Sequence, residues 1–101
     1  MSENLDTLQM ALLSVCRETH EPLHALHLHA EDWLSRPLES DEVEQAIRAM
    51  ERAGLITAYR RVQSEWVVAS AGDAPQAELR FLATPAGAEA AAEAWQLFFG
   101  E

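Results

Sequence analysis

The stretch from Ser40 to Ile56 constrains the fold more than any other part of the sequence. Apolar residues recur here at helical spacing, which predicts a helix with one buried face: Val43, Ala46, Ile47, Met50 and Ala53. Ser40 is a favourable N-cap. Gly54 stands where helices often end in a left-handed residue, with Leu55 placed to fold back on Met50 as in a Schellman motif. The chain therefore passes from a well-bounded helix into a strand-forming segment at one glycine.

Two further helices are expected before this one. The first carries an apolar stripe and should end near Thr19; its stripe is Leu5, Leu8, Leu12, Val15 and Cys16. The second should begin at Pro22, a good first helical position, and end before Pro37, because a residue that precedes proline disfavours the helical region. A length of 101 residues predicts a single domain, 1–101, built on these elements.

Strands and one more helix are expected after Gly54. The segments 56–61 and 66–69 are rich in β-branched and aromatic residues, and 79–83 alternates as a half-buried strand does. A turn cluster at 71–75 suggests an antiparallel ribbon with its tip near Gly72; whether 56–69 is one bent strand or two short ones stays open. Thr84 and Pro85 then provide an N-cap and first turn for a last helix. The expected core is Leu8, Leu12, Val15, Leu26, Val43, Ile47, Met50, Leu55, Phe81 and Trp95.

Three helices, a β-ribbon and a final helix make an α+β chain that resembles a winged helix. Two segments carry the resemblance: 46–56, which is similar to a recognition helix running into a wing, and 82–87, which is similar to the strand-to-helix junction of PadR- and MarR-type regulators. That junction reads leucine, threonine, two variable residues and glycine, and here Ala83 is an extra residue between the leucine and Thr84. The resemblance implies a transcriptional regulator that binds DNA as a dimer, although fold alone does not give function.

Charge bears on that expectation in two ways. The net charge is −10 and every cation is an arginine, so the chain as a whole repels the DNA backbone. The segment 36–61 is nonetheless neutral, with five arginines and five acids. The candidate DNA contacts lie in it: Gln45, Arg48, Arg52, Arg60 and Arg61. This segment is neutral and lacks the excess of positive charge that favours DNA binding. The alternative is therefore an acidic winged-helix module that binds a protein partner and no DNA.

The last helix, about 85–99, is expected to be a dimerisation element. Its small and aromatic residues share one face, as the interface candidates Ala88, Ala91, Ala92, Trp95, Phe98 and Phe99. The resemblance supports this placement, because PadR-like proteins dimerise through a C-terminal helix. The alternative is that the aromatic residues fold back onto the first helix.

Other functional classes find little support in the sequence. His20, His24 and His27 have spacings that could serve a zinc or nickel site, but a solvated polar face is the favoured interpretation, so neither metal nor cofactor is expected. No glycine-rich phosphate loop or nucleophile motif is present, which argues against an enzyme. No apolar run is long enough for a membrane helix and no signal peptide is recognised, so a cytoplasmic protein is expected, with Cys16 as a buried thiol.

Overall fold

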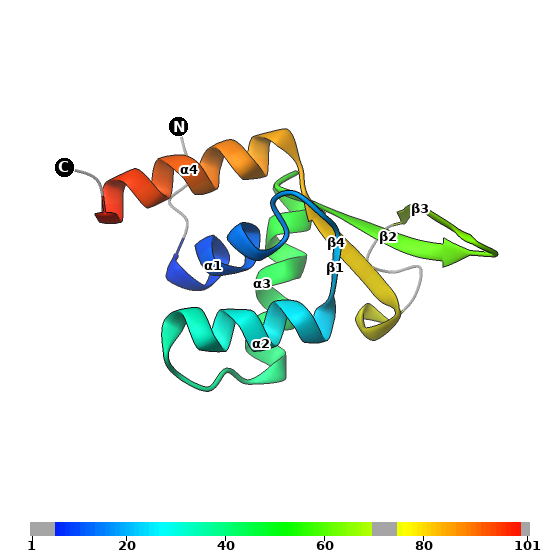
Figure 1. Cartoon of the computed structure of the whole chain (residues 1–101), viewed down its shortest axis with the longest axis horizontal. Coiled ribbons are helices and arrows are strands. Elements are labelled where there is room, and N and C mark those ends of the chain that lie inside the picture. The colour runs from blue at the N-terminus through cyan, green and yellow to red at the C-terminus, as the bar shows by residue number, and fades with distance from the viewer. Residues whose placement is uncertain (1–5, 70–74, 100–101) are drawn as a thin grey trace.

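A computed structural model describes residues 6–69 and 75–99, except the side chains of residues 77 and 97–99. Within these ranges the chain is α+β, with four α-helices and one four-stranded antiparallel sheet (Figure 1). The helices are α1 (Thr7–Val15), α2 (Leu23–Leu34), α3 (Ser40–Arg52) and α4 (Pro85–Phe99). The strands are β1 (Glu21–Pro22), β2 (Ile56–Val62), β3 (Glu65–Ala69) and β4 (Leu79–Ala83), with a 3₁₀ turn, η1, at Gln76–Glu78.

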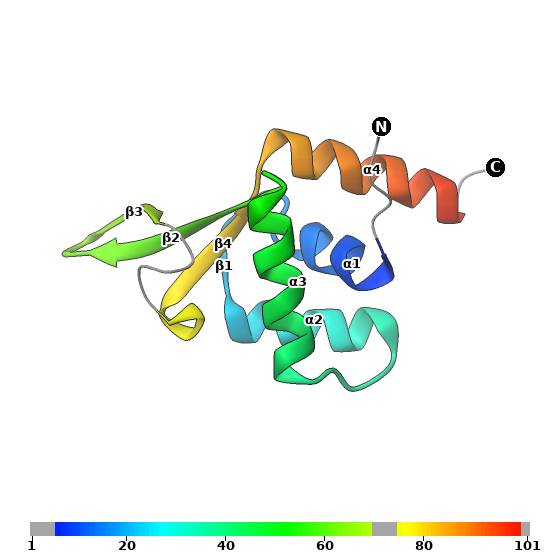
Figure 2. The same ribbon diagram turned by 180° about the vertical axis from the view of Figure 1, so that it is seen from behind.

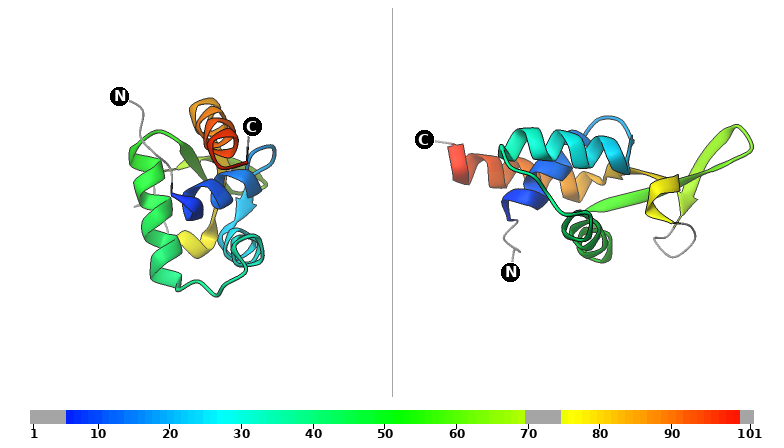
Figure 3. Two further views of the ribbon diagram at one scale, coloured as in Figure 1. Left: turned by 90° about the vertical axis from the view of Figure 1, so that its left-hand side faces the viewer. Right: turned by 90° about the horizontal axis from the view of Figure 1, so that it is seen from below.

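The sheet has the strand order β1-β4-β2-β3. Strand β2 is central and pairs on one side with β4, through Ala58 and Phe81, and on the other side with β3, through Ala58 and Ala69. The β2–β3 hairpin projects beyond the helices, as the right-hand view of Figure 3 shows. One end of the molecule is therefore a two-stranded projection and the other a helical body.

The hairpin turn corrects the expected position of the ribbon tip. Val62 pairs with Glu65, so the turn consists of Gln63 and Ser64, and Gln63 has a φ of 57°. Residues 56–69 are thus two strands, and the tip is not near Gly72, which lies outside the described residues. The prediction was wrong because the residues of this turn lack the glycine, asparagine or aspartate that two-residue hairpin turns prefer.

Helix α1 lies at the centre of the helical layer, in contact with α2, α3 and α4 (Figure 3). It begins at a capping box formed by Asp6 and Gln9, and it ends at Val15 rather than near Thr19. The early end has a structural reason: the carbonyl of Cys16 accepts a 3.0 Å hydrogen bond from the Ala83 N–H of β4. The segment that follows pairs with β4 as β1, a strand too short to be recognised in the sequence.

The predicted Schellman ending of α3 is confirmed. Gly54 has a φ of 76° and donates to the Glu51 carbonyl, while the Leu55 N–H donates to the Met50 carbonyl at 2.9 Å. The start of α3 differs slightly, because Glu39 is the N-cap and Ser40 is the first helical residue. In α2, similarly, Pro22 is the N-cap rather than the first helical residue.

Most of the predicted core is buried. Seven of its members are buried: Leu8, Leu12, Leu26, Val43, Ile47, Met50 and Phe81. Val15 and Leu55 are partly buried against the same cluster. Trp95 was wrongly placed in the core, because its side chain is 45% exposed. The small side chains of Ala91 and Ala94 are the buried ones at this part of α4, since α1 runs close beneath the helix. Leu5 of the predicted stripe lies outside the described residues.

None of the described helices is long and apolar enough to cross a membrane.

Candidate nucleic-acid interface

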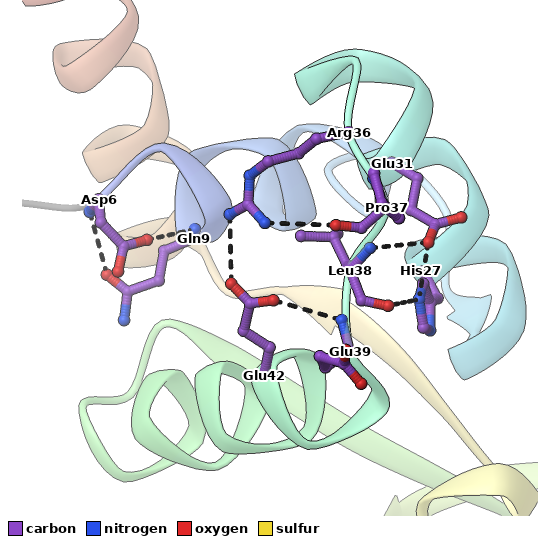
Figure 4. Close-up of polar contacts among 9 residues, drawn as sticks. All are labelled: Asp6, Gln9, His27, Glu31, Arg36, Pro37, Leu38, Glu39 and Glu42. Atoms are coloured by element: carbon purple, nitrogen blue, oxygen red, sulfur yellow. Dashed lines mark hydrogen bonds and ion pairs between the residues drawn. The ribbon is translucent and has the colours of Figure 1, made fainter.

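Helix α3 is held against α2 by a polar clamp on the connection between them (Figure 4). The Glu31 carboxylate accepts a 2.8 Å hydrogen bond from the Leu38 N–H, and the His27 Nε2 lies 2.8 Å from the Leu38 carbonyl oxygen. A carbonyl oxygen only accepts, so Nε2 is the protonated nitrogen of His27 in this contact. The main-chain N–H and carbonyl of the buried Leu38 both have partners, and these two contacts hold the chain in place where it enters α3.

A second contact supports the first turn of α3. The Arg36 guanidinium lies 3.2 Å from the Glu42 carboxylate, and the other oxygen of that carboxylate accepts a hydrogen bond from the Glu39 N–H (Figure 4). The hydrogen bond from Arg36, followed by that from Glu39, lowers the pKa of Glu42 below its ordinary value of 4.5. Glu42 thus acts as a cap for α3 and is not part of its outer face.

The exposed side of α3 carries three of the predicted DNA contacts. Gln45, Arg48 and Arg52 are all exposed, at spacings of three and four residues, opposite the buried stripe of the helix. Figure 2 shows α3 on the side of the molecule that faces the viewer. The Arg48 guanidinium lies 3.7 Å from the Glu44 carboxylate in an i,i+4 ion pair. This side chain therefore has an internal partner that a phosphate or a base edge would have to replace.

The other two predicted contacts lie on the β2–β3 hairpin. Arg60 and Arg61 are exposed, within three residues of the turn at Gln63 and Ser64, and they point to opposite faces of β2. The Arg61 Nε donates a 3.2 Å hydrogen bond to the Gln63 carbonyl, which holds this guanidinium beside the turn. The sequence contains no arginine between residues 71 and 76, where the tip was expected, whereas the observed hairpin carries two arginines close to its turn.

A group of residues that the sequence analysis missed lies on the sheet face turned away from the helices. We call it the outer sheet face. The strand register places the following residues on it: Thr57, Tyr59, Arg61, Trp66, Val68, Arg80 and Leu82. The Arg80 guanidinium stacks 5.1 Å from the Trp66 ring centroid and lies 3.3 Å from the Nδ1 of His20. The contact of Arg80 with Trp66 and His20 depends on the register of the hairpin. The only signal for that register in the sequence was two runs of strand-forming residues separated by two polar residues.

The histidines proposed as metal-ligand candidates are not brought together. His20 packs against Tyr59 and Trp66 at the sheet, His27 belongs to the α2–α3 clamp, and His24 is exposed on α2. In the described part of the chain, no group of three or more histidine, cysteine or acidic side chains is arranged to hold a metal ion.

The lone cysteine is deeply buried. Burial raises the pKa of the Cys16 thiol to about 12, and its Sγ donates to the Leu12 carbonyl. The buried thiol that the sequence suggested is confirmed.

The dimerisation candidates of α4 differ in accessibility. Ala91 is buried within the chain, Ala88 is half-buried, and Ala92 and Trp95 are exposed. The Trp95 ring lies 5.8 Å from that of Trp33 on α2. Beside these rings is an open groove of about 410 Å³, lined by residues of α1, α2 and α4: Ser14, Arg17, Trp33, Ala91, Ala92, Trp95 and Gln96. The side chains of Phe98 and Phe99 lie outside the described residues.

Comparison of the chain with models of protein families, with curated proteins and with solved structures finds no match. A functional assignment therefore rests on the residues and the geometry of this chain alone.

Proposed function

We propose that this chain is a winged helix that binds double-stranded DNA as a homodimer, in the manner of a small transcriptional regulator. In this proposal α3 is the recognition helix and the β2–β3 hairpin is the wing. The observation that carries it is the position of Arg60 and Arg61, exposed beside the turn of a hairpin that projects from the helical body. A wing with cations near its tip can reach the phosphate backbone while the neighbouring helix enters the major groove.

The exposed residues of α3 have suitable chemistry for that groove. Glutamine pairs in a bidentate manner with adenine, and arginine with guanine or with phosphate, so Gln45 can contact a base edge and Arg52 the backbone. Arg48 must exchange its pairing with Glu44 for a contact to DNA. Because an exposed i,i+4 pair contributes only about 0.3–0.5 kcal/mol, this exchange costs little.

A dimer would double the number of cations that can contact one duplex. The chain has only seven cations and a net charge of −10, so one copy has few groups with which to hold a duplex. A two-fold pairing would present the α3 and wing arginines twice. The exposed Ala92 and Trp95 of α4 are the accessible apolar positions on which such a pairing could rest.

Fluorescence anisotropy with a mixed-sequence duplex at low salt tests DNA binding. The Arg60→Ala/Arg61→Ala variant should bind at least about tenfold more weakly, and the slope of log K against log salt should fall by roughly 1.8, at about 0.9 for each lost phosphate contact. The control for the loss of a positive charge is Arg17→Gln, at an exposed arginine after α1; glutamine retains much of the side chain beside the α4 groove, and both quantities should stay unchanged. Equal binding by the double variant and the wild type would refute the wing assignment.

Sedimentation equilibrium tests the dimer. The full-length chain should self-associate, and a chain truncated after Ala94, which lacks Trp95 and the residues beyond it, should be monomeric. A full-length protein that stays monomeric at high micromolar concentration would refute this part of the proposal.

A second function, an acidic module that binds a protein, is favoured by one observation. Three of the exposed large apolar side chains of the described chain lie on the hairpin: Val62, Val67 and Val68. Apolar side chains in this position suit a protein partner better than a phosphate backbone.

A further inference from the structure

The arginines of the sheet differ from most of those of the helical region in their partners. Three of the four arginines of the helical region form ion pairs with carboxylates, namely Arg17, Arg36 and Arg48, and within the described residues Arg52 of α3 is the exception. Within residues 6–69 and 75–99, by contrast, none of the three sheet arginines has a carboxylate within ion-pair distance: Arg60, Arg61 and Arg80. Acids outnumber cations in this chain by 17 to 7, so unpaired cations gathered on one sheet stand out.

The outer sheet face carries positive charge without nearby negative charge on its strands, because none of the strand residues that form it is acidic. Its cations are Arg61 and Arg80, and the acidic strand residues Glu21 and Glu65 fall on the opposite face by register. In a chain with a net charge of −10, this face is a local site for a negatively charged group.

Arg80 is held in place rather than free to move. Its guanidinium stacks on Trp66 and donates to the Nδ1 of His20, whose ring lies 5.8 Å from that of Tyr59. A guanidinium has five N–H donors, and this contact uses one of them. The side chain is half-buried, so little rotamer entropy is lost when a carboxylate binds to it.

An exposed apolar side chain lies in the same row of paired residues across the sheet as Arg80. Tyr59 pairs with Arg80 on one side and with Val68 on the other, and the Val68 side chain is 69% exposed. Strand β3, which carries Val68, is the last strand of the sheet order. A ligand that spans this row therefore meets a guanidinium at one end, an aromatic ring in the middle and an exposed valine at the other end.

We propose that the outer sheet face docks an acidic peptide segment of a partner protein, in which carboxylates alternate with apolar side chains. A carboxylate binds Arg80, and an apolar side chain covers Val68. A single nucleic-acid strand fits less well, because stacking needs open ring faces and the Trp66 ring is already covered by Arg80 and flanked by His20 at 5.5 Å. The proposal does not rest on DNA binding.

The test is fluorescence anisotropy of the full chain with a short labelled peptide of alternating glutamate and valine. Two matched probes accompany it: the same peptide with lysine in place of glutamate, and a single-stranded oligothymidine. The variant Arg80→Gln removes the charge that the carboxylate needs. The variant Val68→Glu places a carboxylate on an exposed position of the face and leaves the core untouched. Leu28→Glu, at the exposed Leu28 of α2, is the control for adding a surface charge.

We expect the glutamate peptide to bind the wild-type chain saturably, and this binding should weaken as salt is added. Its binding to Val68→Glu and to Arg80→Gln should be at least about tenfold weaker. Leu28→Glu should bind as the wild type does. If Arg80→Gln fails to fold, Val68→Glu decides the question alone. Equal binding by Val68→Glu and the wild type, equal binding of the lysine peptide, or binding of oligothymidine without the glutamate peptide would each overturn the proposal. None of these outcomes changes the duplex-binding test of Arg60 and Arg61.

Discussion

The Thr84 hydroxyl donates a 2.7 Å hydrogen bond to the carbonyl oxygen of Gly54. The same hydroxyl accepts a 3.0 Å hydrogen bond from the Gly87 N–H, and the Thr84 N–H donates to the Leu55 carbonyl. One side chain thus caps the start of α4 and attaches it to the end of α3. The orientation of α3 relative to the rest of the helical body depends on this junction.

Replacing Thr84 should therefore destabilise the fold. Thr84→Ala removes both hydroxyl contacts and should lower the free energy of unfolding by about 1–2 kcal/mol. Thr84→Ser keeps the hydroxyl and should stay within about 0.5 kcal/mol of the wild type. Urea denaturation of the three proteins measures the difference. An alanine variant as stable as the serine variant would show that the junction does not need the hydroxyl.

Replacing Gly87 with alanine should destabilise the protein, although alanine is the better helix former. A Cβ at position 87 would lie 1.9 Å from the Leu55 carbonyl oxygen, which is backbone and cannot rotate away. The substitution should cost about 1–3 kcal/mol by overpacking. Helix propensity alone predicts the opposite, a gain of about 0.8–1.0 kcal/mol from replacing glycine in a helix. A thermal melt that shows stabilisation would contradict the close approach of α4 to the end of α3.

The contact between Arg36 and Glu42 predicts a pH dependence of stability. The folded-state pKa of Glu42 lies below its ordinary value of 4.5, so the contact stabilises the protein above that pH and is lost as the pH falls through the folded pKa. Glu42→Gln should therefore be less stable than the wild type at neutral pH and equally stable in acid. Glu89→Gln, at an exposed carboxylate of α4, controls for the general relief of negative charge. A stability difference that persists unchanged in acid would contradict this assignment.

Local signals in the sequence located the ends of the helices well where the residue at the end forms the cap by itself. Gly54 was identified because only a residue without Cβ adopts its left-handed conformation easily, and Thr84 because its hydroxyl can accept from the first turn of α4. The end of α1 was misplaced because it depends on a hydrogen bond from β4, which is distant in sequence.

The candidate site was only partly predictable for the same reason. Arg48 and Arg52 could be placed on the outside of α3 by helical periodicity alone. The contact of Arg80 with Trp66 requires the register of three strands, and that register depends on a turn of glutamine and serine with no strong signal of its own. Trp95 was misplaced because the pattern of α4 does not distinguish the large residues from the alanines as its buried face.

An NMR titration tests whether α3 and the β2–β3 hairpin together bind double-stranded DNA. Amide chemical shifts of the ¹⁵N-labelled chain are followed during titration with a mixed-sequence duplex at low salt. The largest changes are expected around Gln45 and Arg48 on α3 and around Arg60 and Arg61 on the hairpin, and added salt should reverse them. A spectrum that does not change at these residues, while the duplex is in excess at low salt, would contradict the proposed DNA binding.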